Sequence, residues 1–313
     1  MALPLAGVSV GDTHRAALRS IAVLLACTAY ASGTVAQSDS PTPQVTIDAQ
    51  RKAIEPRVRA FVNEYLHVES DEGAARWRSP VCPTVLGLSR ADGEFILARL
   101  SQIAREAGVP LAGEKCSAPN VYVLATLKPA EFLRKWTRLQ HGRMFGGATS
   151  GAINAFIETS RPVRVWYNSS EGGSSQTSED APAGAEPGGI PTVPTVIAHG
   201  GDTYRVTLAL TSAILVVDKT HLQGVTRGQL ADYLGMYAFS PLKTDVRPGD
   251  APTILGLFNA MPTQSPAGLT GWDQALLESL YHADPRTDLR RTTLVRRMVD
   301  QIVSDRSPES HTQ

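Results

Sequence analysis

Short runs rich in β-branched residues alternate with amphipathic runs along this chain, and that order restricts the possible folds more than any other property. Residues 120–127, 161–168, 203–210 and 213–218 read as strands. Between them, apolar residues recur at helical spacing, as at Ile96, Leu100 and Ile103. Alternating strands and helices predict an α/β or α+β class, with a mixed central sheet and helices packed on it.

The helix boundaries are marked by capping residues. Gly108 is expected to end the helix that carries Ile96, Leu100 and Ile103. Pro56 is expected to interrupt the first helix, within 49–67, and the last helix is predicted over about 286–303. Capping boxes are predicted at three helix starts, namely Ser89 with Asp92, Thr226 with Gln229, and Thr270 with Asp273.

The N-terminal region has the pattern of an export signal. Arg15 and Arg19 supply positive charge ahead of the apolar run 20–32, which is too short to span a bilayer. Small residues before a polar stretch favour cleavage after Ala36, which makes 1–36 a signal peptide and the mature protein periplasmic or secreted. Alternatively, the sequence ending at Cys27 resembles a lipoprotein box, which would leave the protein anchored by a lipid at Cys27.

The remaining chain is predicted to form one globular domain over 45–303. Residues 169–189 contain Ser, Gly, Glu, Pro and Ala but no large apolar side chain, so we expect a flexible insertion there. The polar residues 304–313 are expected to form a loose tail. No other apolar run is long enough to predict a membrane-spanning segment in the mature protein.

Cysteine usage and charge agree with an exported protein. Removal of Cys27 with the signal would leave Cys82 and Cys116, which we expect to form one disulfide, with two buried free thiols as the alternative. The formal net charge is zero, from 30 basic and 30 acidic residues. Nucleic-acid binders usually carry a basic excess, so no nucleic-acid partner is expected.

Residues 224–241 predict a buried helix, and they carry a family resemblance together with the segments that follow. A strand precedes this helix, a short turn follows at 251–258, and another helix begins near Leu269. This order, with Gly235 in the first helix, resembles the metzincin clan of secreted zinc proteases, whose active helix reads H-E-x-x-H-x-x-G-x-x-H. In the last helix, the residues that match are Leu269, Thr270, Asp273, Leu280 and Tyr281.

The departures from that pattern bear on activity. With Gly235 aligned, the three zinc histidines are replaced by Gly228, Asp232 and Ala238, and the catalytic glutamate by Gln229. A catalytic zinc needs three protein ligands and a water, and this set offers one carboxylate. We therefore expect no metal and no cofactor, in a zincin-like core that has lost its ligands. The chain also resembles a group of exported proteobacterial proteins, which implies no activity.

Four residues are the candidates for a retained cleft. Gln229 and Asp232 lie where the protease site would be, although Asp232 could equally be an exposed or capped carboxylate whose replacement changes stability only modestly. Trp166 and Tyr167 end a strand and could line a groove for a peptide or a glycan, or could simply pack in the core. The leading hypothesis is a non-catalytic envelope protein that binds a peptide or cell-envelope component, or has a structural role. The alternative is a hydrolase, metal-dependent or not, with an unrecognised site.

Overall fold

The structure is a computed structural model that describes residues 43–69, 73–113, 116–172, 207–246, 249–259, 265–283 and 289–305. The chain divides into two units, Met1–Pro41 and Thr42–Gln313, and every described residue belongs to the second. The predicted signal peptide, Cys27 included, therefore lies outside the described residues. So do residues 173–189 of the predicted insertion and residues 306–313 of the predicted tail.

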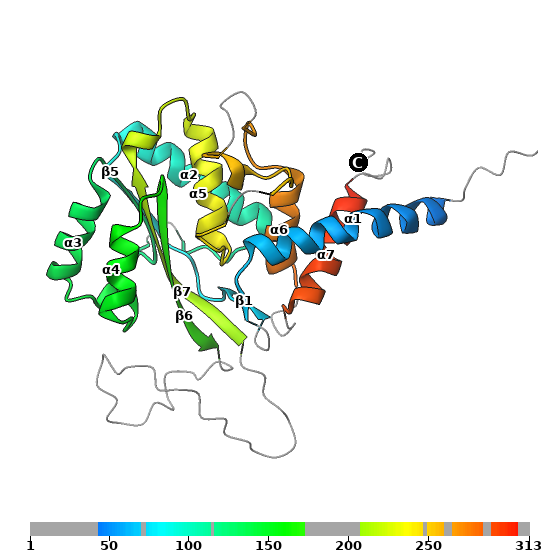
Figure 1. The fold of residues 1–313 in the computed structure, drawn as a ribbon, viewed down its shortest axis with the longest axis horizontal. Helices are drawn as coiled ribbons and strands as arrows, with labels where there is room; N and C mark the ends of the chain where they lie inside the picture. Colours follow the sequence, from blue (N-terminus) through cyan, green and yellow to red (C-terminus); the bar gives the residue numbers. More distant parts are fainter. Residues whose placement is uncertain are drawn as a thin grey trace, which may run out of the picture. The chain divides into compact units, whose positions relative to one another are not determined.

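Helices and strands alternate as the sequence predicts, which confirms the α/β class (Figure 1). The α-helices are α1 Pro43–Tyr65, α2 Arg90–Ala107, α3 Pro129–Leu139, α4 Ser150–Glu158, α5 Arg227–Phe239, α6 Gly271–Tyr281 and α7 Arg291–Ser304. The strands are β1 Val68–Glu69, β2 Gly73–Ala74, β3 Arg76–Trp77, β4 Pro83–Leu86, β5 Val121–Thr126, β6 Val163–Gly172 and β7 Thr207–Asp218. Short 3-10 helices are η1 Arg143–Phe145, η2 Lys219–His221 and η3 Ile254–Gly256.

Strand β7 is the centre of a mixed five-stranded sheet. Along one edge, β7 pairs in parallel with β3 and then with β5, and β5 pairs in parallel with β4. Along the other edge, β6 runs antiparallel to β7 over its whole length. Strands β1 and β2 form a separate two-stranded sheet.

Side chains alternate between the two faces of the sheet, as the pleat requires. Leu215 and Val217 of β7 face a large core shared with α1, α2, α5, α6 and α7. Ile214 and Val216 face a smaller core shared with α3, η1 and α4. Figure 1 shows the same division, with α3 and α4 on one side of the β6–β7 pair and α5 and α6 on the other.

The β6–β7 pair corrects two expectations. The segments 203–210 and 213–218 were predicted as two strands, but β7 is continuous over Thr207–Asp218. The ladder steps from Asn168↔Ser212 to Ser169↔Leu210, so a β-bulge accommodates Thr211 without breaking the strand. Strand β6 in turn runs on through Ser169 to Gly172, so the first four residues of the predicted insertion belong to the sheet.

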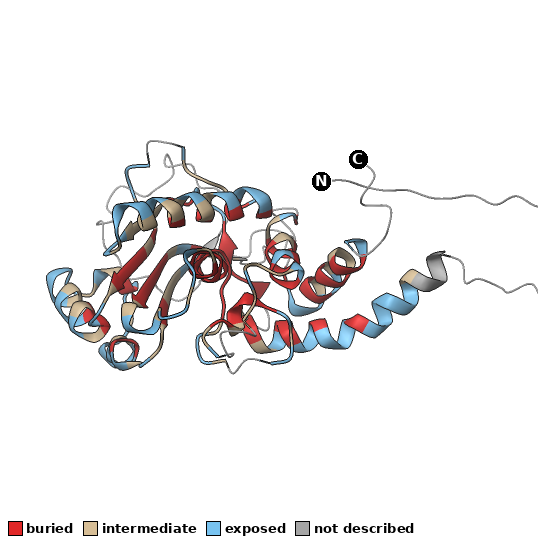
Figure 2. Ribbon diagram, turned by 90° about the horizontal axis from the view of Figure 1, so that it is seen from above, coloured by how far each residue is buried: buried red, intermediate tan, exposed pale blue. Residues whose placement is uncertain are grey.

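Helix α1 also differs from expectation, because it continues through Pro56. Pro56 and Lys52, whose carbonyl loses its usual donor, are both exposed, so water can solvate that carbonyl. Most residues in the first half of α1 are exposed, and burial begins at Ile54 (Figure 2). Burial of the predicted inward face of α7, Val295, Met298, Val299 and Ile302, is confirmed.

Cys82 and Cys116 form the predicted disulfide, with their Cα atoms 5.8 Å apart, within the usual range for such a bond. The bond ties the start of β4 to the loop that leads into β5. Among the helices of the described residues, none has both the length and the apolar character that a membrane crossing requires.

Candidate functional site

Helix α5 is the helix of the metzincin resemblance, and it is buried on every side. The predicted capping box is present: the Thr226 hydroxyl accepts from the Gln229 backbone N–H at 3.2 Å, and the Gln229 side chain accepts from the Thr226 backbone N–H at 3.1 Å. From Gln229 to Phe239, every residue is buried. A helix buried all round must satisfy its terminal backbone groups with protein partners, because water cannot reach them.

At the C-terminus of α5, the last four backbone carbonyls have such partners. The Met236 carbonyl accepts from the Ser240 backbone N–H and hydroxyl. The next three carbonyls accept from aromatic side chains that come from three other segments: Tyr167 Oη to Tyr237 O at 2.8 Å, Trp77 Nε1 to Ala238 O at 2.8 Å, and Tyr281 Oη to Phe239 O at 2.6 Å. All four terminal carbonyls are therefore satisfied by the fold itself.

The N-terminal half of α5 uses its polar side chains to hold the segment that leads into α6. Asp232 is 4% exposed, accepts from Arg99 Nε of α2 at 2.5 Å, and accepts from the Leu269 backbone N–H at 2.9 Å. Gln229 Nε2 donates to the Pro266 carbonyl at 2.8 Å. The hydrogen bond to Asp232 raises the pKa of Arg99 further above its ordinary value.

Asp232 is neither exposed nor a helix cap, so it is not the carboxylate that was the alternative to a cleft residue. It is a buried carboxylate in an ion pair that joins α2, α5 and the start of α6. Because Asp232 is buried and paired, we now expect its replacement to lower the free energy of unfolding more than modestly.

Gly235 has a packing role. A Cβ atom added at Gly235 would lie 2.6 Å from Ile103 Cδ1, so a larger residue here would require the end of the Ile103 side chain to move.

The residues of α5 do not fit a catalytic zinc. Gly228 and Ala238 have no ligand atoms, and both Asp232 and Gln229 already hold other parts of the chain. In the part of the chain that the structure describes, no three His, Cys, Asp or Glu side chains come together as a possible metal site.

Trp166 and Tyr167 lie on opposite faces of β6, and both are partly buried. Trp166 packs edge-to-face against Phe145 and Phe156 in the smaller core, and its indole donates to Asn168 Oδ1 at 3.0 Å. Tyr167 packs against the larger core and caps α5. Each therefore has the packing role that was one of its two alternatives.

Both aromatics also line a cavity of about 400 Å³, here called the ribbon groove, between the β6–β7 pair and residues 241–245. Its wall is mostly apolar, with Val165, Leu208, Leu210 and Leu242 contributing side chains. Most of the sheet residues that line the cavity, such as Tyr167 and Leu210, face the larger core, whereas the Trp166 side chain packs in the smaller one. The aromatics of this cavity were among the predicted site residues, whereas residues 241–245, which form one of its walls, were not.

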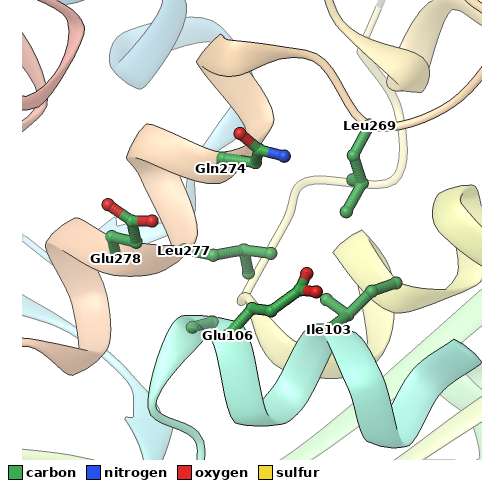
Figure 3. A pocket seen from close by; sticks show the side chains of 7 residues that line it. Ile103, Glu106, Leu269, Gln274, Leu277 and Glu278 are labelled. Carbon is green, nitrogen blue, oxygen red and sulfur yellow. The ribbon is translucent and has the colours of Figure 1, made fainter. Parts of the chain in front are cut away.

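A smaller cavity of about 180 Å³ lies between α2 and α6, lined by the carboxyl side chains Glu106 and Glu278 and the apolar Ile103 and Leu277 (Figure 3). Burial raises the pKa of Glu278. In Figure 3, the Glu106 carboxylate turns toward Ile103 while that of Glu278 points in a different direction. The two carboxyl groups therefore do not point toward each other.

Arg99 and Trp77 are partners of α5 that were not among the predicted site residues. Arg99 follows Ile96 by three residues and precedes Ile103 by four, so its place on the apolar stripe of α2 was a usable signal for a buried ion pair. Nothing in the local sequence around Trp77 indicates that it caps a helix 161 residues away.

Comparison with protein-family models, with curated proteins and with solved structures finds no match to this chain. The resemblance to metzincins and to exported proteobacterial proteins therefore remains a proposal.

Proposed function

We propose that this chain is an exported, non-catalytic binding module of the cell envelope, built on a degenerate metalloprotease-like core, whose ribbon groove holds an extended peptide. The observation that carries the proposal is the groove itself. Its volume of about 400 Å³ lies within the range of ligand sites, and its wall is apolar with a few polar groups at one end, among them Lys243 and Asp245.

The position of the groove favours an extended peptide over a compact ligand. In the described residues, β6 pairs only with β7, so its outer edge has backbone N–H and C=O groups available for another strand. A peptide that adds to such an edge gains backbone hydrogen bonds, while alternate side chains enter a neighbouring groove. The ribbon groove, which is lined in part by β6, would take those side chains.

The contacts of α5 support the non-catalytic part of the proposal. Gln229 and Asp232 use their polar atoms to hold Pro266, Leu269 and Arg99. A side chain that is engaged in this way contributes to the stability of the core. Export is supported by the Cys82–Cys116 disulfide, which is typical of oxidising compartments.

The test is selection of peptides from a randomised display library on the purified mature protein, followed by affinity measurement by fluorescence anisotropy. Thr244 is exposed and lines the groove, so Thr244→Trp should fill it without disturbing the core. We expect selected peptides to lose at least about tenfold in affinity for Thr244→Trp. The control is Thr292→Trp, an exposed position on α7. Equal binding to both variants, or no enrichment of any peptide, would refute the proposal.

A hydrolase is the second candidate, because burial raises the pKa of Glu278 beside the cavity between α2 and α6, and such carboxyls can act as general acids. It would be supported if the wild-type protein cleaves a peptide, ester or glycoside substrate and both Glu278→Gln and Glu106→Gln lose that activity. Retention of activity by both variants would exclude this cavity as the site.

A further inference from the structure

A third cavity, larger than the two described above, lies on the opposite face of the sheet from α5 and is here called the cationic pocket. It has a volume of about 970 Å³ and is bounded by α3, η1, the start of α4 and the β6–β7 pair near the bulge. Its lining includes the basic side chains Arg138, His141 and Arg143, and the polar side chains Asn154 and Ser170.

The charged residues that line this cavity are all basic. None of the residues that line it is Asp or Glu. The nearby carboxylate on α4, Glu158, is already paired with Arg134 at 2.8 Å. In the described residues, neither Arg138 nor Arg143 makes an ion pair, and the only side-chain hydrogen bond of Arg138 goes to the Arg134 carbonyl. Two arginines without an acidic partner therefore line one cavity.

The wall of the pocket is held in shape by backbone and amide contacts. Gly146 and Gly147 take positive φ angles, and a Cβ on Gly146 would lie 2.6 Å from Asn168 Oδ1, so the turn can approach β6 only with glycine there. Asn168 Nδ2 donates to the Met144 carbonyl at 2.7 Å and to Ser212 Oγ at 2.6 Å, which fixes η1 against the sheet. The arginine at the start of η1, Arg143, is therefore presented from an anchored segment.

One polar group at the pocket lacks a partner. The Thr137 hydroxyl is buried and makes no hydrogen bond in the described structure, although Thr137 lines the cavity. Buried hydroxyls without a partner are uncommon in folded proteins, and each requires an explanation. A ligand with oxygen atoms would supply the missing partner after a rotation of this side chain.

We propose that the cationic pocket binds a small polar molecule that carries an oxyanion, the size of a sugar phosphate or sugar acid. Guanidinium groups form paired, charge-assisted hydrogen bonds with phosphate and carboxylate oxygens. The volume of the pocket exceeds what a lone phosphate ion fills, and its hydroxyl and amide groups suit the neutral hydroxyls of a saccharide. This inference stands apart from the ribbon groove, because it rests on different side chains on α3, η1 and α4.

The experiment is calorimetric titration of the purified mature protein with glucose 6-phosphate, glucuronate, inorganic phosphate and glucose, at low and high salt. We expect binding of glucose 6-phosphate or glucuronate that weakens with salt, and weaker or no binding of inorganic phosphate and glucose. Arg143→Gln and Arg138→Gln should each raise the Kd by at least about tenfold. Arg105→Gln, which removes an exposed arginine from α2 outside the pocket, is the matched control and should leave the Kd unchanged.

The arms of the titration separate the outcomes. Binding of glucose 6-phosphate alone assigns the pocket to phosphate esters, and binding of glucuronate alone assigns it to sugar acids. Absence of binding to both, equal binding of glucose, or an equal Kd in the Arg143 and Arg105 variants would overturn the proposal. Arg138 and Arg143 are exposed, so their replacement should leave the melting temperature unchanged, and that measurement excludes misfolding as the cause of lost binding.

Discussion

Replacement of Asp232 by alanine should be among the most destabilising single changes in the N-terminal half of α5. It removes the partner of Arg99 and the acceptor of the Leu269 backbone N–H. The side chain of Asp232 is 6% exposed and that of Arg99 is 25% exposed, so the pair is largely shielded from water. The change should therefore loosen the junction between α2, α5 and the start of α6.

The magnitude follows from these two losses. Breaking a buried ion pair by removing one partner costs roughly 3–5 kcal/mol. Because the Arg99 side chain is partly exposed, water can solvate its charge after the change, so the cost should lie at or below the lower end of that range. An unsatisfied buried N–H at Leu269 costs roughly 1–3 kcal/mol. The two terms overlap, and a loss of about 3 kcal/mol in the free energy of unfolding is the expected result.

The assay is urea unfolding followed by circular dichroism and tryptophan fluorescence, with the disulfide intact. Glu94→Ala, which removes the exposed i,i+4 partner of Arg90, is the control and should cost about 0.3–0.5 kcal/mol. The double variant Asp232→Leu with Arg99→Met should be more stable than Asp232→Ala, because no charge is left buried without a partner. A cost for Asp232→Ala within about 0.5 kcal/mol of the control would refute the assignment of a buried ion pair.

Further outcomes can be checked on the same protein. Gly235→Ala should change the free energy of unfolding by less than about 1 kcal/mol in the same unfolding curves, because the gain in helix propensity offsets a movement of the Ile103 side-chain end. Burial raises the pKa of the Tyr281 phenol. Its contribution to stability is therefore present below pH about 10 and is lost as pH rises above that value. Tyr281→Phe should flatten the fall in unfolding free energy between pH 9 and about 12. Thiol titration of the denatured, unreduced mature protein should find no free thiol, and replacing Cys82 and Cys116 by serine should cost roughly 3–4 kcal/mol. Metal analysis should find well under one equivalent of zinc per chain, and a chelator should leave the melting temperature unchanged, whereas one tightly held zinc would contradict the ligand assignment.

Local signals in the sequence were sufficient to predict most of the secondary structure. The capping boxes at Thr226 and Thr270 and the glycine at Gly108 depend on neighbouring residues alone, and the structure confirms all three. The break predicted between 210 and 213 was wrong, because Ser212 pairs with Asn168 of β6 and a bulge accommodates Thr211. Whether a polar residue ends a strand or sits in a bulge depends on the partner strand, which local sequence does not specify.

The candidate site was harder to predict for the same reason. Asp232 could be placed on a helix, but its environment is decided by Arg99 and Leu269, which are remote in sequence. The ribbon groove likewise depends on residues 241–245 returning toward β6, and on the extension of β6 to Gly172. Pairings between distant segments therefore determine the sites, whereas the periodicity that predicts elements reports only on near neighbours.

The way in which the end of α5 is completed has a consequence for the time course of folding. Its last three carbonyls accept hydrogen bonds from donors that lie 42, 70 and 161 residues away along the chain. Contacts over such separations form slowly, since the closure of long loops precedes any gain from the bonds. A nascent chain that has not yet produced Tyr281 cannot close this helix, so the core should remain incomplete until almost the whole polypeptide has been synthesised. Late compaction of this kind would keep the chain unfolded for longer, as the export that we propose would require.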